Sequence, residues 1–141
     1  MQGNRALILK EWASPAAVVA NENIIREHAE DLKRFLQAYI EAFALYARDP
    51  NRFNALYSED SRLPLPNEVY QSMAAYEPNL SIRDASSVNI LLDISQQETY
   101  QHDADTALRI GIIRQAIDVR SHIDLQTAEA AMSEIKGNRA Q

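Results

Sequence analysis

The sequence predicts a helix-rich α/β chain with one or two short strands and about five or six helices. Apolar residues recur at helical spacing from Ala29 to Ala47, which is typical of a long amphipathic helix with one wide buried face. Glycine occurs only 3 times in 141 residues, and this scarcity favours helices. Two short apolar runs, at 6–9 and 16–20, are the strand candidates.

The elements before the long helix follow one another closely. The run at 6–9 is continuous and includes a β-branched residue, which is typical of a buried strand. Pro15 separates it from the second candidate at 16–20. Asn21 or Asn23 is expected to cap a short helix that ends at His28. Two strands alone do not form a stable sheet, so their partners are expected in a larger protein or in another copy of this chain.

A second group of helices is expected after the long one. Asp49 suits a helix N-cap and Pro50 suits the first helical position, so a new helix is expected to begin there and to continue over 51–57. The prolines that follow predict a loop over 58–66, and a short helix is expected over 67–76. The inward-facing residues of that helix are expected to be Val69, Tyr70, Met73 and Ala74.

The last third of the chain is less clearly divided. A helical segment is expected from Ala85, and the pattern leaves open whether 85–110 is one helix or two. Its N-cap is expected to be Asp84 or Ser86. Gly111 is a natural residue to end it.

A last helix completes the predicted domain. Its expected N-cap is Ser121 or Asp124. We expect residues 1–135 to form a single domain that is a fragment of a larger protein, followed by a flexible tail at 136–141.

Composition and charge limit the classes of function. The net charge of −6, with no run of basic residues, opposes nucleic-acid binding. The absence of cysteine excludes a disulfide scaffold, a zinc–thiolate site and thiol catalysis. No apolar run approaches the roughly 20 residues of a membrane span, and the start of the chain lacks the pattern of a signal peptide.

One polar cluster has residue types that can bind a metal or transfer a proton. If 96–110 is helical, Glu98, His102 and Asp105 lie on one face, because they are spaced by four and three residues. A solvated helix face has the same pattern and is the more common case. No nucleophile with a nearby base and no glycine-rich phosphate loop is present, so we expect no catalytic residue, metal or cofactor.

Trp12 and Ser14 are the candidate ligand-binding residues. They lie in the loop between the two strand candidates, where an aromatic ring and a hydroxyl group can stack on and orient a small ligand. The alternative, which stays open, is that Trp12 covers an edge of the core.

The residues from Val18 to Pro50 carry a resemblance to a known family. A strand that ends in small residues leads into a short helix, and a longer helix then has the pattern Leu-x-x-Phe-x-x-Ala-x-x-x-Ala before an Asp-Pro turn. The residues of that pattern are Leu32, Phe35, Ala38 and Ala42. This order resembles the C-terminal half of ABC-transporter substrate-binding proteins of the nitrate, sulfonate and taurine type, which share a family with thiamine-precursor-binding proteins. Ala29 departs from the proline that is usual there, so the break before the long helix is not enforced.

The resemblance implies the C-terminal portion of a two-lobed type II periplasmic-binding-protein fold. The implied function is capture of a small solute (sulfonate, nitrate or pyrimidine-like) for an ABC transporter by lobe closure about hinge strands. The resemblance implies that the strand candidate at 16–20 is one of these hinges. It implies a periplasmic location, and the membrane permease of the transporter as a partner of the full-length protein.

Two other functions are alternatives to solute binding. One is a helical interaction or dimerisation module without a small-molecule ligand, in which two copies cover each other's apolar faces. The other, an enzyme of the related pyrimidine-synthase kind, is disfavoured. The sequence lacks a convincing nucleophile and a convincing cofactor lysine, so we expect no enzymatic activity.

Overall fold

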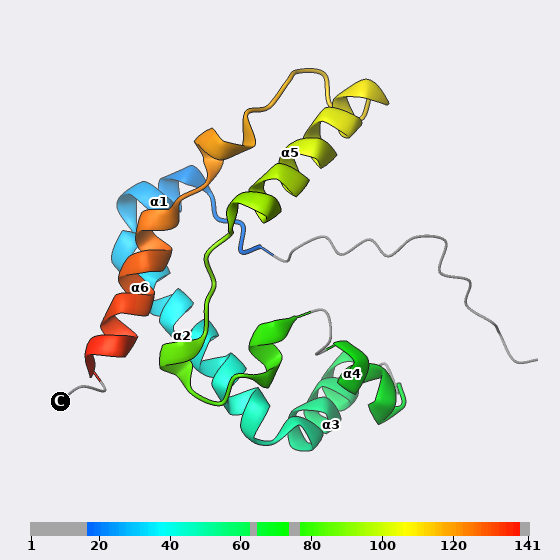
Figure 1. The fold of residues 1–141 in the computed structure, drawn as a ribbon, viewed down its shortest axis with the longest axis vertical. Helices are drawn as coiled ribbons and strands as arrows, with labels where there is room; N and C mark the ends of the chain where they lie inside the picture. Colours follow the sequence, from blue (N-terminus) through cyan, green and yellow to red (C-terminus); the bar gives the residue numbers. More distant parts are fainter. Residues whose placement is uncertain (1–16, 63–64, 74–76, 139–141) are drawn as a thin grey trace, which may run out of the picture.

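The described part of the chain is built from helices. The computed structural model describes residues 17–62, 65–73 and 77–138, and these contain six α-helices and three short 3₁₀ helices, with no strand (Figure 1). The prediction of a helix-rich chain is therefore confirmed. Residues 17–20 form no strand, so the strand prediction at 16–20 is wrong for these four residues. Their β-branched composition favours a strand only where another strand can pair with them, and no other strand occurs in the described ranges. The candidate at 6–9 lies outside the described residues.

The first two helices follow the predicted order. Helix α1 (Glu22–Glu27) is capped by Asn21, whose side chain accepts a hydrogen bond from the N–H of Asn23 at 2.9 Å. Helix α2 (Ala29–Arg48) begins after His28, whose backbone dihedrals (φ −130°, ψ 34°) interrupt the helical path. The break between the short and the long helix is thus present without a proline.

Helix α3 (Pro50–Ser61) begins at the predicted Asp-Pro turn but ends later than expected. The Asp49 side chain accepts from the N–H of Arg52 at 3.2 Å. The loop prediction is wrong for residues 58–61, because this polar stretch contains no helix breaker and the helix ends only at Arg62, in the left-handed conformation (φ 56°).

Helix α4 (Asn67–Met73) packs on α3. The rings of Tyr57 and Tyr70 meet edge to face, with centroids 5.9 Å apart. Tyr70 is buried as predicted, whereas Val69, also expected to face inward, is exposed.

The segment expected to be helical from Ala85 is divided. After the 3₁₀ turn η1 (Pro78–Ser81), a second 3₁₀ turn η2 (Ala85–Ser87) is capped by Asp84 as predicted. Residues 88–93 then form a non-helical link, and α5 (Ile94–Arg109) begins with a capping box between Asp93 and Gln96. Gly111 follows α5 with φ 80°, which agrees with its predicted role at the helix end.

The chain returns to α2 through its last elements. The 3₁₀ turn η3 (Val119–His122) leads to α6 (Leu125–Asn138), whose predicted cap Asp124 accepts from the N–H of Thr127 at 3.2 Å. The first residues of the predicted tail, 136–138, belong to α6, and the flexibility of the tail stays a prediction.

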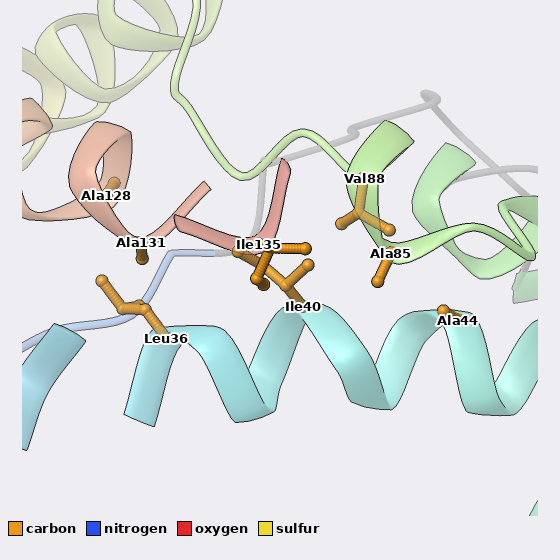
Figure 2. Close-up of a cluster of buried hydrophobic side chains, with 8 residues drawn as sticks. All are labelled: Leu36, Ile40, Ala44, Ala85, Val88, Ala128, Ala131 and Ile135. Carbon is orange, nitrogen blue, oxygen red and sulfur yellow. The ribbon is translucent and has the colours of Figure 1, made fainter. Parts of the chain in front are cut away.

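The core lies where α6 and η2 pack on α2. Figure 2 shows Ile40 of α2 pointing toward Ile135 of α6, with Val88 beside η2. Ile40 is 0% exposed and Val88 is 1% exposed. Alanines at the crossing, such as Ala131, let the backbones approach closely. The complete cluster is Leu36, Ile40, Ala44, Ala85, Val88, Ala128, Ala131 and Ile135.

Candidate functional site

A groove runs between α2 and α6 on one side and the 88–93 link and the start of α5 on the other. Its volume is about 1500 Å³. The segment 17–20, which the sequence suggested as a hinge strand, also lines this groove. Residues from the start, the middle and the end of the described chain therefore line the same groove.

Helix α2 supplies the apolar floor of the groove. Leu32, Leu36, Tyr39 and Phe43 repeat every three or four residues, so they form one edge of the helix. The rings of Tyr39 and Phe43 meet edge to face, with centroids 4.9 Å apart. Burial raises the pKa of the Tyr39 hydroxyl, and the nearby carboxylate of Glu77 raises it further.

Two asparagines hold the 88–93 link in place. The side chain of Asn79 donates to the carbonyl of Asn89 at 2.8 Å and accepts from its N–H at 3.1 Å. The side chain of Asn89 accepts from the N–H of Leu91 at 3.0 Å. The N–H groups of Ile90 and Leu92 donate to no acceptor in the described residues.

The charged groups on the groove wall are acidic. Glu77, Asp93 and Asp124 line it, each as the capping residue of a helix or turn, and His122 lies among them. No lysine or arginine belongs to the described lining. The groove thus combines an apolar floor with a negatively charged wall.

The polar cluster on α5 is engaged by its neighbours. Glu98 forms an ion pair with Arg120 of η3 (N–O distance 3.7 Å), and Asp105 accepts from Gln101 at 2.9 Å. His102 is exposed beside them. No group of three or more His, Cys, Asp or Glu side chains that could bind a metal occurs in the described ranges. These contacts favour the solvated-face interpretation of Glu98, His102 and Asp105.

The candidate residues Trp12 and Ser14 lie outside the described residues, and their role stays a prediction. Sequence reasoning missed Asn79 and Asn89, which hold the link. Their partnership joins residues ten positions apart through side-chain amides, and no periodic pattern indicates such a pair. The only local signal was the Glu-Pro-Asn turn that contains Asn79.

Known proteins supply no relative that could assign this groove. No protein-family model, curated protein or solved structure matches this chain. Across the described ranges, no helix combines the length and the apolar character needed to cross a membrane.

Proposed function

We propose that this chain is part of a solute-binding protein of the ABC-transporter type, with the C-terminal portion of a two-lobed type II periplasmic-binding-protein fold. It contributes one side of a cleft that closes on a small solute, a sulfonate, nitrate or a pyrimidine-like compound. The full-length protein delivers the solute to a membrane permease and works in the periplasm. The sheet strands of the α/β lobe come from the rest of that protein.

The observation that carries this proposal is the lining of the groove by residues 17–20. The resemblance assigns this segment to the hinge between lobes, and a hinge borders the cleft that it opens and closes. The short helix, the long helix and the Asp49-Pro50 turn then follow in the order that the resemblance implies. Tyr39 supplies a half-buried aromatic ring with a hydroxyl group to the floor of the same groove.

Thermal unfolding in the presence of taurine, nitrate and an aminopyrimidine tests the proposal. A ligand at about 100 times its dissociation constant stabilises the folded state by about 2.7 kcal/mol and raises Tm by several degrees. The measurement is made on this chain and on the longer protein that contains it. We expect Tyr39→Ala to remove the shift, and Leu56→Ala, on exposed surface outside the groove lining, to retain it. No shift with any of the three solutes in either protein would refute solute binding.

A second candidate function, self-association, is favoured by a second apolar face on α2. Phe35 and Leu45 are 54% and 48% exposed, and the exposed Ala38 and Ala42 lie between them at helical spacing. At 100° per residue this stripe lies roughly opposite the buried Ile40. Small alanines flanked by large apolar side chains suit close packing against a second helix.

Replacing Phe35 by Glu tests this second function. In a self-associating chain, a charge within the stripe costs desolvation energy, so Phe35→Glu is expected to weaken the dimer at least about tenfold. Sedimentation velocity over a concentration series measures the change. Leu56→Glu, at a similarly exposed apolar residue on α3, is the matched control. A wild-type chain that stays monomeric at the highest concentration would exclude this function.

A further inference from the structure

Two backbone N–H groups on one edge of the 88–93 link, those of Ile90 and Leu92, have no acceptor in the described residues. We propose that this edge and the adjoining groove bind an extended segment of another polypeptide, with an apolar face and basic residues at its ends. The inference rests on the geometry of the groove and does not depend on solute binding. The groove is lined by α2 and by the start of α5, among other segments. Figure 1 shows where these two helices lie.

The first observation is which N–H groups of the 88–93 link have hydrogen-bond acceptors. In an extended chain, alternate residues direct their N–H groups to opposite edges. The N–H groups of Asn89 and Leu91 are taken by the side-chain oxygens of Asn79 and Asn89. Those of Ile90 and Leu92 have no acceptor in the described ranges, although the carbonyl of Leu92 accepts from Nε2 of Gln97 at 2.8 Å. The alternate edge therefore offers two unpaired N–H groups. An edge of this kind accepts a strand through main-chain hydrogen bonds.

The size and character of the groove define the body of the partner. A volume of about 1500 Å³ exceeds the roughly 300–1000 Å³ of a typical small-molecule pocket. Ile90 and Leu91 of the link pack against the core while they line the groove, and Val19, 92% exposed, faces the same space. A strand with one apolar face covers this surface and also satisfies the free amides.

The charges of the wall define the ends of the partner. Glu77, Asp93 and Asp124 place three carboxylates along the groove, and no lysine or arginine in the described lining offsets them. Each carboxylate accepts a hydrogen bond as a cap but has further lone pairs available. Lysine or arginine at the ends of the bound segment complements this wall, and acidic ends are repelled by it.

The test uses the peptide Lys-Val-Thr-Val-Thr-Val-Lys, blocked at both ends, with the full chain and no solute. Binding is measured by fluorescence anisotropy, and amide hydrogen exchange is followed by NMR. With saturating peptide, exchange of the Ile90 and Leu92 amides is expected to slow at least about tenfold. The amides of Asn89 and Leu91, which are already bonded, change less. This readout is independent of any solute, so its failure is distinct from failure of the solute-binding proposal.

Matched controls separate strand pairing from unspecific binding. The same peptide with glutamate at both ends, or with proline at the central position, is expected to bind at least about tenfold more weakly. Val19→Lys is expected to weaken binding, and Leu56→Lys, which lies outside the groove, to leave it unchanged.

Three results would overturn the proposal. The first is absence of peptide binding up to about 1 mM. The second is binding that leaves exchange at Ile90 and Leu92 unchanged. The third is full protection of these amides in the free chain, which would mean that another part of the same chain occupies the groove.

Discussion

Lys33 links the two helices of the core through its ammonium group. Its Nζ atom lies 2.6 Å from Oε1 of Glu134 on α6 and 2.8 Å from Oε2 of Glu30 on α2. The Lys33 side chain is only 16% exposed, although its charged end meets partners at the surface. The hydrogen bond to Glu134 is the main cause that raises the pKa of Lys33, with a smaller contribution from Glu30. Hydrogen bonds from Lys33 and then Gln37 lower the pKa of Glu134.

These pKa shifts set the pH dependence of the ion pair between Lys33 and Glu134. Because the pKa of Glu134 is lowered, its stabilising effect is present above the ordinary value of 4.5 and is lost as the pH falls through the lowered value. Because the pKa of Lys33 is raised, its effect is present below 10.5 and is lost as the pH rises through the raised value. The ion pair between Lys33 and Glu134 therefore contributes its full stabilising effect across the neutral pH range.

Glu134→Gln is expected to lower Tm at neutral pH and to make Tm less dependent on pH in the acid range. The difference from the wild type is small, because the pair is at the surface, and it shrinks as the pH falls well below 4.5. Circular dichroism melts over the acid-to-neutral range measure it. Glu129→Gln, on an exposed part of α6, is the control. An equal difference between wild type and Glu134→Gln at acid and neutral pH would contradict this assignment.

Single residues also explain which helix boundaries could be predicted. Asn21, Asp49 and Asp124 cap helices as expected, because a cap depends on a side chain and the N–H groups two or three residues later. Gly111 is equally local, since the left-handed conformation favours glycine. The bonds between Asn79 and Asn89 join η1 to the 88–93 link, and the turn that contains Asn79 does not indicate its partner.

Helix α5 is held to the rest of the described structure by few contacts. Of the described helices and turns it contacts only η3, and none of its residues is buried. In Figure 1 it projects away from the α2–α6 pair. Gln101 makes the connection: its Nε2 donates to the carbonyl of Ile117 at 2.9 Å, and its Oε1 accepts from the N–H of Val119 at 2.9 Å. This side-chain amide and the ion pair between Glu98 and Arg120 thus align η3 along α5.

Gln101→Ala is expected to release η3 while α5 stays helical, because the capping box at Asp93 is retained. The Val119 amide loses its acceptor, and its hydrogen exchange is expected to accelerate at least about tenfold. Gln126→Ala, on an exposed part of α6, serves as the control. Unchanged exchange at Val119 would show that other contacts hold η3 to α5.

Whole-element predictions failed where packing outweighed local pattern. The run from Ala85 has helical spacing, but Val88 enters the core beside η2 and the link then bends to Asp93, where a new cap begins. Residues 17–20 are rich in β-branched side chains but have no strand beside them in the described ranges. Each failure depends on which elements lie beside the segment, and the local sequence does not contain that information.

At the scale of the whole molecule, the described residues leave apolar surface uncovered in two places. Helix α2 buries one stripe around Ile40 and exposes another through Phe35 and Leu45. A second apolar region lines the groove beside the 88–93 link. Exposed apolar regions of this kind mark surfaces that bind other molecules. Both the lobe of a larger solute-binding protein and the self-associating module account for them, and the two differ in what covers the surface.

The sequence by itself determined the helix-rich class, the long helix at 29–47 and most of its neighbours' caps, because periodicity and capping act over a few residues. It also indicated that the long helix has a wide apolar surface. Only the tertiary structure decided that this surface divides into a buried stripe, a groove floor and an exposed stripe, because α6, η2 and the link cover α2 unequally. Only the tertiary structure also decided that the N–H groups of Ile90 and Leu92 stay unpaired in the described ranges, since this depends on which amides the side chains of Asn79 and Asn89 reach.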